Sequence, residues 1–159
     1  MARSTKAAHV GGASRPCPAR VVALARGWIG TPYRHQASLK GVGADCLGLI
    51  RGVWRELYGH EPVSPPPYSH DWGETSSDDP LWRAAERYLA PSSGERPGDV
   101  LLFRMAPGAT AKHLAIRANC GDLAPTIIHA YSGRSVIESP FIGSWRRRVV
   151  ATFRYPERT

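Results

Sequence analysis

The N-terminal half of the chain carries hydrophobic residues at helical spacing. In "PARVVALARGWIG" they recur at intervals of three and four, which predicts a helix that begins near Pro18 and ends before Gly30. A second predicted helix begins at Asp45, a good N-cap residue, and is closed by Gly59 as a C′ glycine. Its buried stripe comprises Ile50, Val53, Trp54 and Leu57. The segment "LWRAAERYLA" predicts a third, short amphipathic helix.

The pattern changes after Pro97, where short runs of strand-forming residues alternate with turn signals. These runs are "GDVLLFRM", "KHLAIRAN", "TIIHAY", "SVIES" and "RRRVVATFRY". Helices followed by consecutive short strands indicate an α+β domain, in which N-terminal helices pack on a C-terminal antiparallel sheet of about five strands. The segments between the strands are too short for parallel crossovers.

Two segments lack any hydrophobic period. Residues 1–17 are small and polar and predict a flexible N-terminal arm. Residues 60–80 are rich in Pro, Ser and Asp and predict a long surface loop, either a lid or a docking surface. Because neither flank of this loop is large enough to fold alone, we expect one domain over 18–159.

Composition narrows the range of partners. The chain has 159 residues and a formal net charge of +8, which favours anionic surroundings such as nucleic acid, anionic lipid or an acidic cell-wall polymer. The interleaved aromatic and basic pattern of a nucleic-acid binder is missing, so we expect no nucleic-acid partner. No apolar run is long enough for a membrane span, and the N-terminus lacks the apolar core of a signal peptide. We therefore expect a protein made in the bacterial cytoplasm, without membrane insertion.

One cysteine and two histidines form a candidate catalytic set. Cys46 follows Asp45 at the start of the second helix. In strands of period two, His113 lies opposite Leu114, and His129 lies opposite Ile128. If the two strands pair, both histidines project from one side of the sheet. A helix packed on that side would bring Cys46 to them.

Each member of the set has a chemical reason to be there. A helix N-terminus and a nearby imidazolium both lower the pKa of a thiol. A histidine can move the proton to a leaving amine, and a second polar group can hold its ring. The amides of the first helical turn offer a site for an oxyanion.

Structural interpretations compete with this one. Cys46 could fill the core, and a strand histidine could be a satisfied structural residue. Zinc could bind Cys46, His113 and His129, but a structural site needs a fourth ligand and no CxxC or HxxxH is present. The remaining candidates are expected to be loop, tail or solvated surface residues: Cys17, Cys120, His9, His35, His60, His70 and, on a strand edge, Arg146–Arg148.

Several blocks resemble the NlpC-type cell-wall cysteine peptidases. They are "GWIGTPYRHQASLKGVGADCLGLI", "RPGDVLLFR", "KHLAI" and "IIHAY", which cover about residues 20–132 in the family's order. The resemblance implies a papain-like fold, no cofactor, and cleavage between D-glutamate and a diamino acid in peptidoglycan stem peptides. It implies Cys46 as the nucleophile, His113 as the base and His129 as the group that orients it. It also implies that Tyr33 and Asp45 contribute to the oxyanion or substrate-binding part of the site; a turn aromatic packed on the sheet is the alternative for Tyr33.

The chain departs from the family pattern at two places. Leu47 replaces the usual serine after the nucleophile, and His35–Gln36 replace a usual Gly-Gly pair. "ADCLGLIRGVWRELYG" is most similar to the phage-tail branch, which includes gene transfer agents, and implies tail or baseplate proteins as partners. Two alternatives share the scaffold: a tail-tip structural adaptor with little or no turnover, and a cysteine acyltransferase or amidase.

Overall fold

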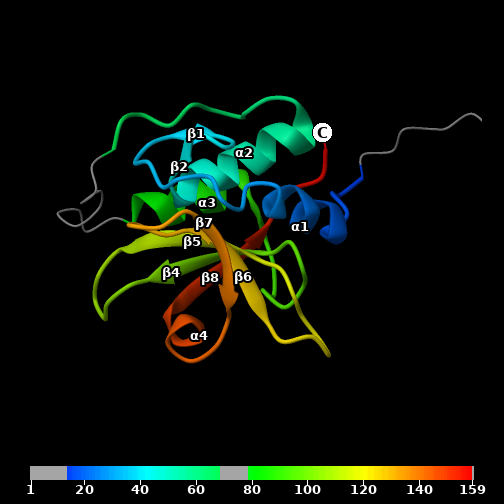
Figure 1. Cartoon of the computed structure of the whole chain (residues 1–159), viewed down its shortest axis with the longest axis vertical. Coiled ribbons are helices and arrows are strands. Elements are labelled where there is room, and N and C mark those ends of the chain that lie inside the picture. Colours follow the sequence, from blue (N-terminus) through cyan, green and yellow to red (C-terminus); the bar gives the residue numbers. More distant parts are fainter. Residues whose placement is uncertain (1–13, 69–78, 159) are drawn as a thin grey trace, which may run out of the picture.

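The protein is built from two layers, a six-stranded antiparallel sheet and three helices that cover one of its faces (Figure 1). The computed structural model describes residues 14–68 and 79–158. The helices on the covered face are α1 (Pro18–Arg26), α2 (Cys46–Tyr58) and α3 (Pro80–Tyr88). A short helix, α4 (Ser144–Arg148), lies against the opposite face.

The sheet has the strand order β3-β8-β4-β5-β6-β7. Its strands are β3 (Ala90–Pro91), β4 (Val100–Arg104), β5 (Ala111–Arg117), β6 (Thr126–Ala130), β7 (Val136–Pro140) and β8 (Val149–Arg154). A separate small hairpin joins β1 (Ser38–Leu39) to β2 (Gly43–Ala44). The predicted α+β class is confirmed, with six strands rather than about five because β3 adds a two-residue edge strand.

Two segments differ from the prediction. Arg146–Arg148, expected on a strand edge, belong to α4 and leave only Val149–Arg154 as strand. Trp145 explains the difference, because its side chain packs against the hydrophobic cluster beneath the sheet and turns the chain before β8 begins. The hairpin β1–β2 lies between the first two helices, where the sequence predicts no regular element. Part of the 60–80 loop, residues 69–78, lies outside the described residues, as do residues 1–13 of the predicted arm.

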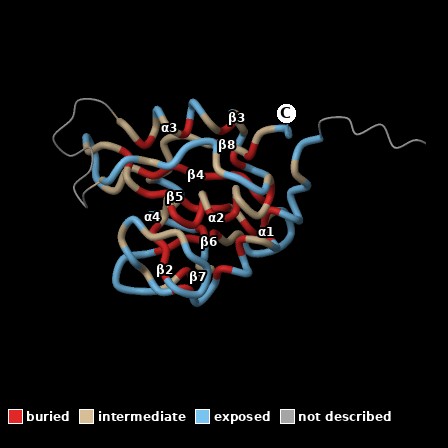
Figure 2. The backbone as a smooth tube through the Cα atoms, turned by 90° about the horizontal axis from the view of Figure 1, so that it is seen from above, coloured by how far each residue is buried: buried red, intermediate tan, exposed pale blue. Residues whose placement is uncertain are grey.

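Helix α2 forms as its sequence predicts. The Asp45 side chain accepts a hydrogen bond from the Gly48 amide, and Gly59 closes the helix in the left-handed conformation, with φ 84°. The apolar face of α2 packs on the sheet in the larger of two hydrophobic clusters, which includes Leu49, Val53 and Leu114. The second cluster fills the other face of the sheet around Phe103 and Phe141. Figure 2 shows the buried residues along the strands and on α2.

No helix in the described ranges, 14–68 and 79–158, is long and apolar enough to cross a membrane.

Gly52 allows α1 and α2 to approach closely. A Cβ atom at this position would lie 2.0 Å from the indole ring of Trp28, which is 2% exposed and donates a 2.6 Å hydrogen bond to Glu56. Gly52→Ala is therefore expected to lower the free energy of unfolding by about 1–3 kcal/mol, as overpacking does elsewhere. Urea denaturation measures this change. Gly27→Ala is the control, because its Cβ would meet the movable end of Lys40, and an equal loss in both variants would contradict the prediction.

Candidate active site

The sheet opens between β5 and β6, and this opening creates the site. Strands β5 and β6 pair only at Ile116↔Ile128 and Arg117↔Ile127, whereas β6 continues to pair with β7 as far as Ala130. The first half of β5 therefore lacks a partner on its β6 side. The amide of Ala118, just after β5, donates to the Thr126 carbonyl of β6, so the even-numbered residues of β5 direct their amides and carbonyls toward this gap.

The sulfur of Cys46 occupies the gap. Its thiol donates to the Lys112 carbonyl over 3.6 Å, and the Leu114 amide also approaches the sulfur. These two backbone groups belong to the residues on either side of His113 and point toward β6. The thiol therefore contacts the groups that would otherwise form hydrogen bonds with a neighbouring strand. The start of α2 thus brings Cys46 to the histidine strand at His113.

Both histidines lie on the same side of the sheet, as their strand register predicts. His113 is paired with Phe103 in the β4–β5 ladder and lies on the α4 side of the sheet. Helix α2 packs on the other side, with Leu114. The expectation that α2 and the histidines share one side is therefore wrong. The thiol meets the histidine strand because it reaches into the gap between two strands.

The two imidazoles form a hydrogen-bonded chain. His113 Nε2 lies 2.8 Å from His129 Nδ1, and His129 Nε2 lies 2.9 Å from Ser139 Oγ on β7. His113 is 8% exposed and His129 is 1% exposed, so these contacts replace hydration. Of the four ring nitrogens of this pair, only His113 Nδ1 takes no part in these hydrogen bonds. It is therefore the nitrogen that could accept a proton.

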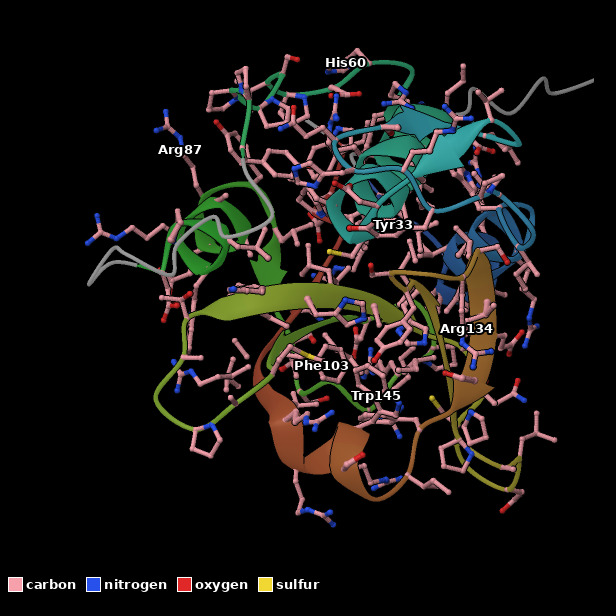
Figure 3. The ribbon with its side chains drawn as sticks, turned by 60° about the vertical axis from the view of Figure 1, so that its left-hand side comes forward. Tyr33, His60, Arg87, Phe103, Arg134 and Trp145 are labelled. Carbon is pink, nitrogen blue, oxygen red and sulfur yellow. The ribbon has the colours of Figure 1, made fainter. Side chains whose placement is uncertain are left out.

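Aromatic side chains surround the imidazoles. Trp145 of α4 packs against both rings, with centroid distances of 5.4 Å to His113 and 5.0 Å to His129. Phe103 lies 5.6 Å from the His113 ring, and Tyr131 lies 5.8 Å from the His129 ring. Figure 3 shows Phe103 and Trp145 together on one side of β5 and Tyr33 on the other. This apolar surrounding fixes the ring orientations and removes water from them.

Burial keeps the thiol and both imidazoles neutral. It lowers the pKa of His113 to about 3, with a further contribution from His129, and lowers the pKa of His129 to about 4. Burial and the Asp45 carboxylate raise the pKa of the Cys46 thiol to about 12, although the amides of Leu114, Leu47 and Cys46 act in the opposite direction. The expected lowering of the thiol pKa is therefore wrong for the free protein, because loss of hydration outweighs the helix amides.

These depressed histidine pKa values predict a loss of stability in acid. Unfolded histidine titrates near 6.5, so between about pH 6.5 and pH 4 the unfolded chain binds protons that the folded chain does not. The free energy of unfolding should fall as the pH drops through this window, by up to about 1.4 kcal/mol per pH unit for each histidine. Urea titrations across the window measure the slope. A His113→Gln/His129→Gln double variant should flatten it, and equal slopes in both proteins would refute the assignment.

Asp45 holds the start of α2 and the adjoining loop together. It is 3% exposed, its Oδ1 accepts from the Gly48 amide and its Oδ2 accepts from the Gln36 amide, both at 2.7 Å. The Tyr68 hydroxyl also donates to Oδ2. The predicted N-cap is confirmed. With its oxygens engaged within the protein, Asp45 fixes the position of the neighbouring thiol, and direct substrate contact by Asp45 stays a prediction.

Tyr33 lies close to the thiol on the α2 side of the sheet. It bridges to Ala44, two residues before Cys46, and its side chain is partly buried. Burial raises the pKa of Tyr33, and the neighbouring Cys46 and Asp45 raise it further. The structure thus places Tyr33 near the Cys46 sulfur. Its role at an oxyanion stays a prediction.

The other cysteines and histidines lie apart from this set. Cys17 is exposed at the start of α1, and Cys120 is partly buried in the β5–β6 turn. His60 is exposed, as expected, but His35 is partly buried and its Nε2 lies 2.7 Å from the Tyr68 carbonyl, so the solvated interpretation of His35 is wrong. His9 and His70 lie outside the described residues. Among the described residues, no three His, Cys, Asp or Glu side chains are placed to hold a metal ion.

Three contributors to the site were not predicted from the sequence. Trp145 and Phe103 bury the imidazoles, and Ser139 ends their hydrogen-bonded chain. The period of two in β7 could have found Ser139, because it pairs with Ile127, which shares a face with His129. No local pattern marks Trp145, because its segment reaches the site only through the turn at α4.

Comparisons with known proteins find a family model and solved structures that are similar to this chain. A family model described as NlpC/P60 family matches residues 30–154. The solved NlpC/p60 domain of the peptidoglycan hydrolase SagA is 27% identical, with a TM-score of 0.53, over 79% of this chain and 90% of that domain. An NlpC/P60 family protein from Bacillus cereus is 20% identical, with a TM-score of 0.59, over 90% of this chain and 41% of that one. NlpC1 from Trichomonas vaginalis is 19% identical, with a TM-score of 0.55, over 89% and 45%.

The chain spans less than half the length of the last two proteins, and these two likenesses show the fold alone. No curated protein matches the chain.

Proposed function

The chain belongs to the NlpC/P60 family, and on that premise we propose that it is a cysteine peptidase that hydrolyses peptidoglycan stem peptides. The observation that carries this proposal is the position of the Cys46 thiol in the β5–β6 gap, where it donates a hydrogen bond to the carbonyl of Lys112, the residue before His113. The similar SagA domain comes from a protein named a peptidoglycan hydrolase, which supports a cell-wall substrate. The test is release of soluble fragments from purified peptidoglycan, compared with the Cys46 variant described in the Discussion.

The hydrogen-bonded chain suggests how the proton moves. When His129 donates from Nε2 to Ser139, its Nδ1 accepts from His113 Nε2, which leaves a lone pair on His113 Nδ1. This nitrogen takes the thiol proton as the sulfur attacks the scissile carbonyl. The imidazolium then protonates the departing amine, and the neutral ring activates the water that releases the acyl group. A neutral resting pair fits proton transfer during attack rather than a preformed ion pair.

The oxyanion has donors at the start of α2. The amides of Cys46 and Leu47 face the sulfur, whereas the Gly48 amide is occupied by Asp45. Amides in this position can stabilise the negative oxygen of a tetrahedral intermediate, and the Tyr33 hydroxyl is a further candidate donor.

We propose further that the bond cut joins D-glutamate to a diamino acid, and that the protein reaches the wall on a phage-like tail. The likeness of residues 44–59 to the phage-tail branch supports the carrier, and the net charge of +8 suits an anionic stem peptide. Digesting peptidoglycan of known chemistry and weighing the fragments identifies the bond. Immunoblotting of purified particles tests the carrier, and a protein found only outside them would contradict it.

The structural adaptor is the second candidate, and burial of the site favours it. Both imidazoles are less than a tenth exposed, and the thiol is protonated at neutral pH. An adaptor would keep a closed site in every assembly. Labelling with iodoacetamide separates the two candidates. In an enzyme, the Cys46 thiol must react with the reagent while the protein is folded, whereas in an adaptor with a closed site the thiol should stay unlabelled.

A further inference from the structure

Residues 60–68 form a strap that is fixed at its first end to α2. The Glu61 carboxylate binds Arg51, with Oε2 3.1 Å from Arg51 Nε, and it also pairs with Arg55. The Glu61 side chain is 15% exposed, so water screens these pairs only in part. Arg55 continues to the Ser38 hydroxyl, which ties the strap's anchor to the β1–β2 hairpin.

The other end of the strap is fixed beside the candidate active site. The Tyr68 hydroxyl donates to Asp45, and the Tyr68 carbonyl accepts from Gln36 and lies 2.7 Å from His35 Nε2. The His35 and Tyr68 rings meet edge to face, with centroids 5.1 Å apart. The His35–Gln36 pair thus has a structural use that Gly-Gly would lack, namely to hold the strap.

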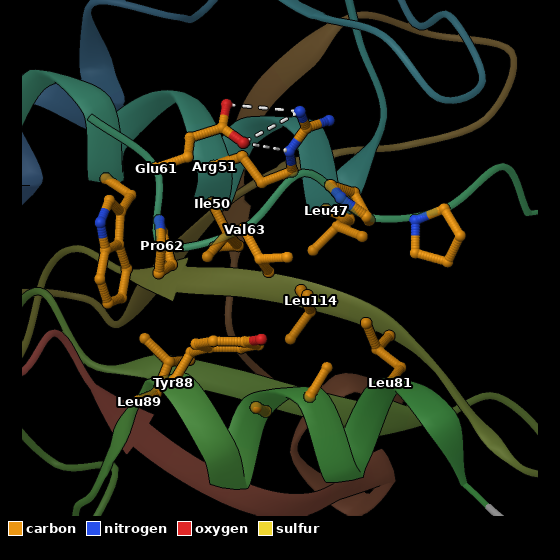
Figure 4. A pocket seen from close by; sticks show the side chains of 15 residues that line it. Leu47, Ile50, Arg51, Glu61, Pro62, Val63, Leu81, Tyr88, Leu89 and Leu114 are labelled. Carbon is orange, nitrogen blue, oxygen red and sulfur yellow. Dashed lines mark hydrogen bonds and ion pairs between the residues drawn. The ribbon is translucent and has the colours of Figure 1, made fainter.

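Between its two fixed ends the strap covers an apolar cavity of about 240 Å³ (Figure 4). Pro62, Val63, Pro65 and Pro66 form its roof, and four prolines within six residues stiffen this segment. Helix α2 contributes one wall, α3 contributes the other, and Leu114 of β5 lies between them. The restricted backbone torsions of the prolines resist collapse of the strap into the cavity.

The lining restricts what the cavity can hold. Side chains such as Leu47, Ile50, Trp54 and Leu81 give almost entirely carbon surface. The polar groups of the lining are the Arg51–Glu61 pair, the Tyr88 hydroxyl and the indole nitrogen of Trp54. A peptide backbone or a sugar would lose most of its hydrogen bonds there without replacement. An apolar cavity of roughly 150 Å³ in another protein stays dry and binds benzene, and this cavity is larger. The lining therefore fits a hydrocarbon group best.

The charged side chains at the edge of the cavity indicate the charge of the ligand's head group. Arg51 and Glu61 line the cavity, and Arg55, which lies outside the lining, also pairs with Glu61, so this cluster carries two positive charges against one negative charge. This surplus favours an anionic head group. We propose that the cavity beneath the strap binds a single alkyl chain that ends in a carboxylate or another acidic head, with the chain inside and the head at Arg51.

This site is separate from the candidate active site. Leu47 and Leu114 line the cavity, but their neighbours Cys46 and His113 do not. The proposal therefore stands whether or not the chain is a peptidase. It also gives Leu47 a role, because the serine usual at this position would place a hydroxyl in a carbon-lined space.

Titration calorimetry with the saturated acids hexanoate, octanoate and decanoate tests the proposal on the full chain. Burial of each added methylene should tighten binding roughly fourfold until the cavity is full. Decanoate should bind more tightly than decanol, and Arg51→Gln should remove that preference. Failure of decanoate to bind, or an affinity that does not depend on chain length, would overturn the proposal.

Two tryptophan variants locate the binding. Ala84 of α3 lines the cavity, so Ala84→Trp should fill it and abolish decanoate binding, whereas Ala23→Trp, on the exposed surface of α1, should leave binding unchanged. Circular dichroism confirms that both variants are folded. Undiminished binding by Ala84→Trp would place the ligand elsewhere. Concentration-dependent dimers that Ala84→Trp dissociates would assign the cavity to a second copy and overturn the proposal.

Discussion

Replacing Cys46 by alanine is expected to abolish the release of stem-peptide fragments from purified peptidoglycan, by a factor of at least roughly 10³. Removal of the sulfur eliminates the covalent intermediate, and the remaining amides and imidazoles cannot attack the carbonyl. Liquid chromatography of the soluble fraction, with mass detection, measures the released fragments. Because the thiol makes only weak contacts, with the Lys112 carbonyl and nearby backbone amides, the fold should survive its loss.

The chain offers a matched control for this variant. Cys120→Ala removes another partly buried thiol, in the β5–β6 turn, and should keep full activity. The unfolding midpoint of the Cys46 variant should stay close to that of the unchanged protein. Persistent turnover in the Cys46 variant would remove the peptidase mechanism, whereas inactivity of the unchanged protein, with a thiol that iodoacetamide cannot reach, would favour the adaptor.

The fold could be predicted where local sequence chemistry decides it. Helix α2 begins and ends where its cap residues indicate, since Asp45 bonds the first turn and Gly59 adopts positive φ. The strands of the second half follow their period of two. The elements that were missed, α4 and β3, form through contacts with distant residues: Trp145 packs beneath the sheet, and β3 pairs with β8. Short segments carry too little periodicity to reveal such contacts.

The cysteine and the two histidines of the site could be predicted from the sequence, but their geometry could not. Alternation along the strands correctly placed His113 and His129 on one face, because side-chain direction is a local property of a strand. The gap between β5 and β6 depends on the residue at which their pairing ends. The sequence of neither strand by itself indicates that residue. The pKa error has the same origin. The burial that raises the thiol pKa comes from residues that the fold packs around the start of α2, which a helix-start argument does not include.

Replacing His113 by alanine is expected to reduce hydrolysis by roughly 10²–10⁴-fold, the usual contribution of a positioned acid–base group. The loss should fall mainly on kcat, because His113 acts on the proton of the thiol and of the leaving amine rather than on substrate affinity. His129→Gln should cost less, since glutamine can still bond to both His113 and Ser139. Steady-state kinetics on a soluble stem peptide measure both variants.

The pH dependence of thiol alkylation distinguishes a base from a packing residue. In the proposed mechanism His113 accepts the thiol proton, so iodoacetamide should label Cys46 at a pH well below the thiol's own pKa of about 12. Without the imidazole, labelling should become dependent on hydroxide and move to higher pH. His60→Ala, an exposed histidine near the end of α2, is the control and should leave the profile unchanged. A structural defect alone would change the extent of labelling but not its pH midpoint. If His113→Ala leaves the pH midpoint unchanged, His113 is a buried packing residue and the base lies elsewhere.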